Sequence, residues 1–131
     1  MREVSFVQGY HAHVYYGAAD DRRRADALGQ DIAARFAVSL GHAHDVPVGP
    51  HPLPMYQVSF AVDQFATFVP WLMLNRQGLD ILVHPVTGDD LSDHRDGALW
   101  LGRSLTLNLG FFPSPRPATE APATAASSTS G

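Results

Sequence analysis

The sequence predicts a single α+β domain of the ferredoxin-like class, a split βαβ sandwich with one additional C-terminal strand. Two observations lead to this prediction. Segments rich in aromatic and alternating residues, typical of strands, are interspersed with two segments whose apolar residues recur at helical spacing. Their order along the chain is β-α-β-β-α-β followed by one more strand, which is the pattern of a sheet with two helices on one face.

The first half of the chain is expected to form a strand, a helix and a short second strand. Residues 9–16 alternate and are rich in aromatic side chains, as strands often are. Asp20 or Asp21 can cap a helix that continues through Leu40, and a second strand is expected within residues 39–45. The helix carries apolar residues at helical spacing, namely Ala25, Leu28, Ile32, Ala33 and Phe36.

The middle of the chain is expected to form a loop, a strand and a second helix. Residues 46–54 contain four prolines and one glycine, which predicts a loop, and residues 55–62 have the pattern of a strand. Asp63 can cap a helix that ends near Gly78, and Pro70 should kink this helix or mark its true start. Its apolar face comprises Phe65, Phe68, Val69, Leu72 and Met73.

The last two strands are expected at residues 79–84 and 99–109, separated by a loop rich in aspartate and glycine. Composition then changes abruptly. In residues 113–131, 17 of 19 residues are Pro, Ala, Ser, Thr or Gly, a composition that cannot bury enough apolar surface to offset the entropy of ordering. We therefore expect a folded domain over residues 1–112 and a disordered tail over residues 113–131.

Composition narrows the chemistry that the chain can perform. The 131 residues include seven histidines but no cysteine and no lysine. The absence of cysteine excludes disulfides, thiolate catalysis and cysteine-bound metals, and the absence of lysine excludes Schiff-base chemistry. A formal net charge of −4 argues against a nucleic-acid partner. Histidine, which transfers protons near neutral pH and binds divalent metals, is therefore the residue type to follow.

The sequence also predicts a cytoplasmic protein without a membrane partner. Residues 1–8 contain Arg2 and Glu3 and lack the apolar run of a signal peptide. The longest uncharged apolar stretch, residues 65–74, is about half as long as a segment that crosses a bilayer.

Alternation along the strands predicts which histidines share a face of the sheet. His11 and His13 lie on one face of the first strand. If the alternating Leu and Ile residues of the fourth strand face the helices, His84 lies on the opposite, open face together with His11 and His13. The same argument places Gln57 and Ser59 of the third strand on that open face.

Imidazoles that converge from separate strands can form a divalent metal site. Ligand–metal distances of about 2.0–2.1 Å require the rings to meet at one point. In the alternative interpretation, His11 and His13 are half-exposed strand residues without a ligand role. His42 and His44 border a loop, and we expect them to be bystanders at the surface.

Three further kinds of side chain are candidates for the site. Asp93 or Asp89 can orient an imidazole or complete a set of two histidines and one carboxylate, or their segment can be a solvated turn. Arg76 can bind a substrate carboxylate through two parallel hydrogen bonds, or be an exposed cation at a helix end. Tyr15 is the tyrosine of its strand expected on the histidine side.

An ordered series of short motifs covers residues 9–102. The motifs are Gly9-Tyr-His-Ala-His-Val-Tyr-Tyr16, Val48-Gly-Pro-His-Pro52, Met55-Tyr-Gln-Val58, Leu74-Asn-Arg76, His84-Pro-Val-Thr-Gly-Asp89, Asp93-His94 and Trp100-Leu-Gly102. Together they resemble the DOPA 4,5-dioxygenase family. The ordered series is far more specific to that family than any one of its motifs.

The resemblance implies a ferredoxin-like fold and extradiol cleavage of a catechol, such as DOPA, by O₂ at a non-haem Fe(II). Family members are similar at the positions matched by His13, His51, His84 and His94. On this basis we predict that His13, His51 and His84 bind the metal, with Zn or another divalent ion as a possible occupant in a purified sample.

The same resemblance suggests roles for the remaining candidates. Extradiol cleavage needs a positioned acid–base group that takes a proton from the catechol and later returns one. His94 is the first candidate for this group and His11 the second. Arg76, Asp93 and Tyr15 are assigned to the substrate side, with Arg76 neutralising the carboxylate of a DOPA-like substrate and Asp93 orienting its neighbours.

Other interpretations stay open at this point. The alternative to an enzyme is a non-catalytic dimeric ferredoxin-like module that binds a metal or a small aromatic ligand, because such sandwiches host many unrelated functions. An enzyme that acts on another catechol and a metal-assisted hydrolase also fit the sequence. A sheet face left uncovered by helices would favour a homodimer.

Overall fold

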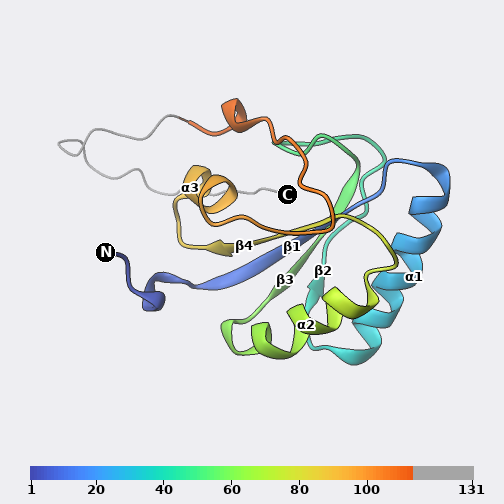
Figure 1. Cartoon of the computed structure of the whole chain (residues 1–131), viewed down its shortest axis with the longest axis horizontal. Helices are drawn as coiled ribbons and strands as arrows, with labels where there is room; N and C mark the ends of the chain where they lie inside the picture. The colour runs from blue at the N-terminus through green and yellow to red at the C-terminus, as the bar shows by residue number, and fades with distance from the viewer. Residues whose placement is uncertain (114–131) are drawn as a thin grey trace.

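Five antiparallel strands form the sheet on which the molecule is built. The computed structural model describes residues 1–113, so the expected tail lies outside the described residues apart from Pro113. The sheet order is β2-β3-β1-β4-β5, and every adjacent pair is antiparallel. The first four strands have the predicted split βαβ order, and β5 extends the sheet beyond β4 (Figure 1). The strands are β1 (Gly9–Tyr15), β2 (Ser39–Leu40), β3 (Met55–Phe60), β4 (Ile81–Val86) and β5 (Leu99–Leu101).

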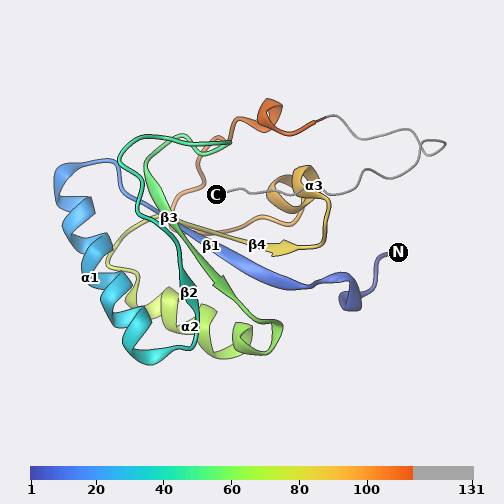
Figure 2. The same cartoon turned by 180° about the vertical axis from the view of Figure 1, so that it is seen from behind.

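Three α-helices lie on the two sides of this sheet. α1 (Ala19–Arg35) and α2 (Phe65–Asn75) lie together on one side, as predicted. α3 (Asp90–Arg95) and the C-terminal segment, residues 102–113, lie on the other side, as both Figure 1 and Figure 2 show. None of the helices within residues 1–113 has the length and the apolar composition that crossing a membrane requires.

The helix boundaries differ from the sequence predictions for local reasons. α1 begins after Ala18, because the Asp21 carboxylate turns back and accepts hydrogen bonds from the backbone N–H groups of Gly17 and Ala18. It ends at Arg35 rather than Leu40, because the chain becomes extended at Phe36 to reach β2. The predicted end of this helix is therefore wrong and Asp20 is not its cap, whereas Asp21 caps the helix from within its first turn.

α2 also begins later than predicted. A 3₁₀ turn, Val62–Gln64, precedes it, and the Gln64 side chain accepts a hydrogen bond from the Ala61 N–H at 2.8 Å, so Asp63 is not the cap. The helix continues through Pro70 and stops at Asn75. Left-handed backbone at Gln77 (φ 61°) and Gly78 (φ 74°) then turns the chain into β4.

The region after β4 holds the largest departure from the predictions. Residues 90–95, expected to be a loop, form α3, because Asp89 caps it by accepting a hydrogen bond from the Ser92 N–H at 3.1 Å. The fifth strand covers only residues 99–101 instead of 99–109. The residues after 101, which were expected to continue this strand, instead cross the face of the sheet that lies opposite α1 and α2.

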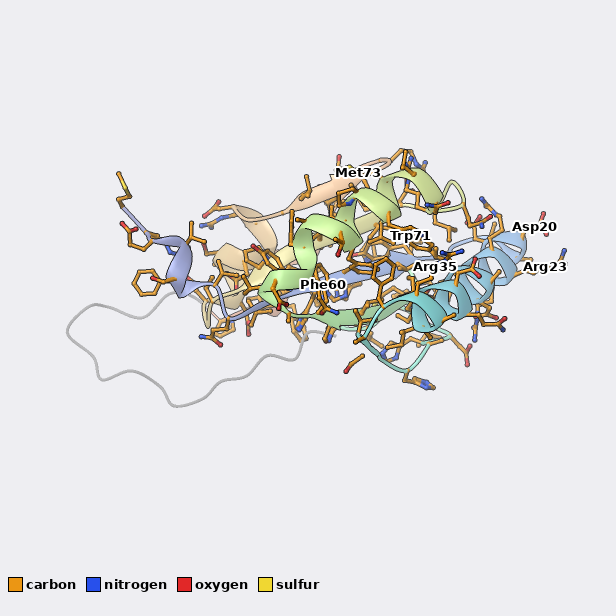
Figure 3. All side chains as sticks on the ribbon, turned by 90° about the horizontal axis from the view of Figure 1, so that it is seen from below. Asp20, Arg23, Arg35, Phe60, Trp71 and Met73 are labelled. Atoms are coloured by element: carbon orange, nitrogen blue, oxygen red, sulfur yellow. The ribbon has the colours of Figure 1, made fainter. Side chains whose placement is uncertain are left out.

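The main core lies between the sheet and the two long helices, and it confirms the predicted alternation. It contains Ala12 and Val14 of β1, and these face the helices while His11 and His13 do not. On the helix side, Trp71 of α2 lies beside Arg35 of α1, whose guanidinium carbon is 5.8 Å from the ring centroid (Figure 3). The buried strand residues of this core also include Tyr56, Val58, Phe60, Ile81 and Val83.

The second face of the sheet is covered by the chain itself. Tyr15, Met55 and Leu82 form a small second core on this face. They pack against side chains from the proline-rich loop and the C-terminal segment, namely Val48, Leu53, Ala98, Trp100, Leu105 and Leu107. The expectation of an open face is therefore wrong, because the segment after β5 folds back over it. A homodimer stays a prediction, without the uncovered face that motivated it.

Gly102 allows the C-terminal segment to turn over this face, and its replacement should destabilise the fold. Its φ is +86°, and an added Cβ would lie 2.5 Å from Oδ1 of Asp80. We predict that Gly102→Ala lowers the free energy of unfolding by about 1–3 kcal/mol, measured by urea denaturation. Gly110→Ala is the matched control, because a Cβ there would meet only an ordinary contact at 3.4 Å. Equal stability of the two variants would contradict this account of the turn.

Candidate metal centre

Five of the seven histidines meet on the second face of the sheet. β1 provides His11 and His13, and β4 provides His84, which is paired directly with His11. His51 arrives from the proline-rich loop and His94 from α3. Four of them are almost completely buried, with exposed fractions of 0% for His13, 3% for His51 and 2% for His84 and His94. Only His11 keeps partial contact with solvent.

The rings of these residues are close enough to act on one small ligand. The Nε2 atoms of His13 and His84 are 3.0 Å apart. The ring centroids of His13 and His51 are 4.2 Å apart, and those of His84 and His94 are 4.0 Å apart. His11 lies at the edge of the group, with its centroid 5.2 Å from that of His84. The structure therefore brings together all five residues that the sequence nominated.

Backbone carbonyls fix the proton of two of the rings. Nδ1 of His84 is 2.8 Å from the carbonyl oxygen of Pro85, and Nδ1 of His94 is 2.8 Å from that of Asp90. Since a carbonyl can only accept, each Nδ1 carries the proton and donates it. In the neutral ring, Nε2 then holds a lone pair that is available to a metal ion or to an acidic proton.

His51 is held in a different way, by a tyrosine. Nδ1 of His51 lies 2.7 Å from the hydroxyl oxygen of Tyr15, which is itself 2% exposed. Burial raises the pKa of the Tyr15 phenol, so this group remains protonated at neutral pH. A phenol can donate or accept here, and the arrangement in which it accepts leaves Nε2 of His51 free to bind a metal. Tyr15 thus lies on the histidine side as predicted, and its contact is with an imidazole.

Several ring nitrogens in this group are buried and lack a partner, and this observation tests whether a metal would fit. They are Nδ1 of His11 and His13 and Nε2 of His51 and His94. Buried polar atoms without partners are costly unless something binds them. Two ligands about 2.1 Å from one ion and at a right angle to each other are about 3.0 Å apart, which matches the His13–His84 separation. The donor set therefore fits a divalent metal that prefers imidazole.

Within residues 1–113, two sets of three histidines have ligand atoms within 4.8 Å of one another. One set is His11, His13 and His84, and the other is His13, His51 and His94. His13 belongs to both sets. The predicted ligands His13, His51 and His84 are divided between the two sets, and their role as ligands stays a prediction. Neither set contains a carboxylate, which differs from the combination of two histidines and an aspartate considered from the sequence.

The histidines of the cluster are neutral because they are buried together. Burial, together with the neighbouring imidazoles, lowers the pKa of His51 and of His84 to about 3 and that of His11 to about 4. The pKa of His13 is lowered well below its ordinary value for the same two reasons. Burial also lowers the pKa of His94, although the Asp90 carbonyl opposes this shift. Neutral imidazole is the form that binds metals.

Asp93 is buried beside the cluster but contacts a different group. Its two carboxylate oxygens accept hydrogen bonds from the backbone N–H of Thr87 at 2.8 Å and from the Thr87 hydroxyl at 2.6 Å. It has no hydrogen bond to an imidazole, so the expected orienting contact is absent. Asp89, the other carboxylate considered, caps α3. Asp93 instead fastens α3, and with it His94, to the end of β4.

Arg76 lies at the opposite end of β4 from His84. Its Nε donates to the Leu79 carbonyl oxygen at 2.9 Å and closes the turn between α2 and β4. Its predicted contact with a substrate carboxylate stays a prediction. His42 and His44 lie in the segment after β2 and pack edge-on against each other, with centroids 5.1 Å apart, and their role as bystanders stays a prediction.

Two features of the site were not predicted from the sequence. The helix that carries His94 has acidic residues in its first turn and His94 and Arg95 in its last turn, a charge pattern that could have identified it. Phe112, at the end of the expected domain, packs against His94 with ring centroids 4.6 Å apart. No local pattern predicts that contact, because it depends on the path of the C-terminal segment.

The lowered pKa values predict how the metal-free protein responds to acid. The unfolded chain binds protons as the pH falls through about 6.5, whereas His11, His51 and His84 of the folded protein do not until about pH 4 or below. The free energy of unfolding should therefore fall between pH 6.5 and 4, by up to about 1.4 kcal/mol per pH unit for each such histidine. Urea unfolding in the presence of a chelator measures this slope.

A pair of variants isolates the contribution of the cluster. His84→Gln should show a shallower dependence on pH than the wild type, whereas His42→Gln, at an exposed position, should keep the wild-type slope. Identical slopes for all three proteins would show that the buried cluster does not control the acid response.

Comparisons with a family model and with curated proteins give consistent matches. Residues 10–111 match the model of the Dopa 4,5-dioxygenase family. A DOPA 4,5-dioxygenase from Amanita muscaria is 35% identical over 118 residues, covering 83% of this chain and 51% of that protein. An uncharacterised 21.2 kDa protein from Botryotinia fuckeliana is 44% identical over 71 residues, covering 48% of this chain and 39% of that protein. The chain thus spans about half the length, or less, of these curated relatives.

A solved structure supports the same grouping. A crystal structure of a protein from Nostoc punctiforme, provisionally named a dioxygenase, superposes with a TM-score of 0.82 at 52% sequence identity. The match covers 85% of this chain and 96% of that one. By the family match and the similarity to the Amanita muscaria enzyme, this chain belongs to the DOPA 4,5-dioxygenase family.

Proposed function

We propose that this chain is an extradiol dioxygenase that opens the ring of a catechol, such as DOPA, with O₂ at a histidine-bound Fe(II). The observation that carries the proposal is the cluster of His13, His51, His84 and His94 in a chain of this family, because its buried nitrogens lack partners. Such a cluster costs stability in a fold unless a ligand satisfies it. A divalent metal would bind Nε2 of His51, which has no partner, together with the Nε2 atoms of His13 and His84, which otherwise contact only each other.

His13, His51 and His84 are the proposed ligands. The Pro85 carbonyl and the Tyr15 hydroxyl hold the Nδ1 atoms of His84 and His51, which leaves their Nε2 atoms for the ion. When bound, Fe(II) supplies the open coordination positions at which non-haem oxygenases bring substrate and O₂ together. His13, His51 and His84 are 0%, 3% and 2% exposed, so bulk water has little access to this group.

His94 is the proposed acid–base group. Its Nδ1 donates to the Asp90 carbonyl, so its Nε2 is the free, basic nitrogen, and this atom is buried without a partner. A neutral Nε2 can take the proton of a catechol hydroxyl as the catechol binds and return it when the ring opens. His11, at the solvent-reached edge of the cluster, is the second candidate and can pass protons to and from water.

Catechol cleavage is tested directly by loading the protein with Fe(II) without oxygen, adding L-DOPA and then admitting O₂. We expect consumption of O₂ and formation of a yellow ring-opened semialdehyde, and chelation of the metal should abolish both. His13→Ala and His84→Ala should lose bound iron, because each removes a nitrogen of the closest pair. His42→Ala is the control and should keep iron and activity.

A panel of catechols extends this test to the alternatives. Oxygen uptake with another catechol but not with DOPA would leave the reaction in place and change the substrate. A wild-type chain that binds metal but consumes no O₂ with any catechol would be a binding module and would overturn the proposed activity.

His94→Gln separates proton transfer from metal binding. We expect this variant to retain iron and to turn over about 10²–10⁴-fold more slowly, because it lacks the basic nitrogen. Metal analysis and steady-state kinetics measure the two effects separately. Loss of iron instead would assign His94 to the ligands, as in the set of His13, His51 and His94. Unchanged turnover would remove its proposed role.

A further inference from the structure

The proton of His13 must change its position if His13 and His84 are to share an ion. Nδ1 of His84 donates to the Pro85 carbonyl, so Nε2 of His84 is an acceptor. The 3.0 Å contact between the two Nε2 atoms is therefore donated by Nε2–H of His13. A nitrogen that carries a proton cannot bind a metal. For both Nε2 atoms to bind one ion, the His13 proton has to reside on Nδ1.

On Nδ1 this proton needs an acceptor, and one buried side-chain oxygen offers it. Nδ1 of His13 is buried and has no partner. Within residues 1–113, five buried side-chain atoms lack a hydrogen-bond partner, and four of them are ring nitrogens of the cluster. The fifth is Oε1 of Gln57, an amide oxygen that can only accept.

The sheet register places Gln57 next to His13. Gln57 of β3 is paired directly with His13 of β1, so the two side chains lie on the same face with their Cβ atoms about 4.5–5.5 Å apart. The amide Nε2 of Gln57 donates to Oγ of Ser59 at 3.2 Å. This bond occupies the donor end of the amide and leaves the oxygen for another group.

We propose that Gln57 is a positioning residue of the metal centre, whose amide oxygen accepts a hydrogen bond from Nδ1–H of His13. In this role it holds the tautomer in which Nε2 of His13 binds a metal ion beside His84. The inference rests on the proposed function only in taking His13 as a ligand. It assigns two states to the neutral ring of His13. Without metal, the proton is on Nε2 and is shared with His84. With metal bound, the proton is on Nδ1 and is donated to Gln57.

Metal titration of matched variants of the full chain tests this role. Gln57→Met keeps the size of the side chain and removes the acceptor, whereas Gln57→Glu keeps an acceptor at the same position. We expect Gln57→Met to bind Co(II) about 10–100-fold more weakly than the wild type, measured by competition with a coloured chelator. Gln57→Glu should stay close to the wild-type affinity. Ser59→Ala is the control, because it removes only the partner of the amide nitrogen.

Nuclear magnetic resonance of the protein with ¹⁵N-labelled histidine provides a second readout, independent of activity. In the Zn(II)-loaded wild type, we expect His13 to carry its proton on Nδ1 and to show it protected from exchange with water. The metal-free wild type should carry this proton on Nε2. Gln57→Met should lose the protection, and Gln57→Glu should restore it. If Gln57→Met fails to fold, the two wild-type spectra and Gln57→Glu still decide the question.

The possible failures are distinguishable. Wild-type Co(II) affinity in Gln57→Met together with a protected Nδ1 proton would overturn the proposal. A rise in the KM for a catechol without a change in metal affinity would instead place Gln57 against the substrate, and a changed pH profile alone would place it against His11. A wild-type chain that binds Co(II) but does not cleave catechols contradicts the proposed function and leaves this inference intact. A wild-type chain that binds no metal overturns both.

Discussion

The site depends above all on the pairing of β1 with the two strands beside it. β1 lies between β3 and β4, and its register sets His11 against His84 and His13 against Gln57. Because side chains alternate along a strand, a shift of one residue in either pairing would send these side chains into the main core. The alternating residue Val14 is fully buried on the other face, so the same register that fills the core also gathers the imidazoles.

The second constraint is the cost of burying imidazoles away from water. A sheet with one uncovered face would leave the histidines hydrated, with ordinary pKa values. Here α3, the proline-rich loop and the segment after Gly102 cover that face and exclude water. Backbone carbonyls and the Tyr15 hydroxyl then satisfy one nitrogen on each of three rings, and the Nε2 atoms of His51 and His94 stay without a partner. Desolvation and partial hydrogen bonding together turn a group of histidines into a site with unmet binding capacity.

Sequence patterns predicted the sheet side of the site well, because strand alternation is a local property. The common face of His11, His13 and His84 follows from parity, and the order of strands and helices follows from hydrophobic periodicity. His51 and His94 came from the family resemblance, since their approach to the sheet depends on a loop and on a short helix. Contacts that arise from the path of the chain, such as that of Phe112 with His94, have no counterpart in any local pattern.

The misassigned carboxylate shows why residue type and position do not settle a role. Asp93 adjoins His94 in sequence and is as deeply buried, which made it a natural partner for an imidazole. In a helix, however, successive side chains point in different directions, so neighbours in sequence are not neighbours in space. Asp93 points to Thr87, where it accepts from both the backbone N–H and the hydroxyl and closes the connection between β4 and α3. Because its oxygens are engaged there, Asp93 leaves the cluster to neutral imidazoles, and in our proposal the choice among their tautomers controls the site.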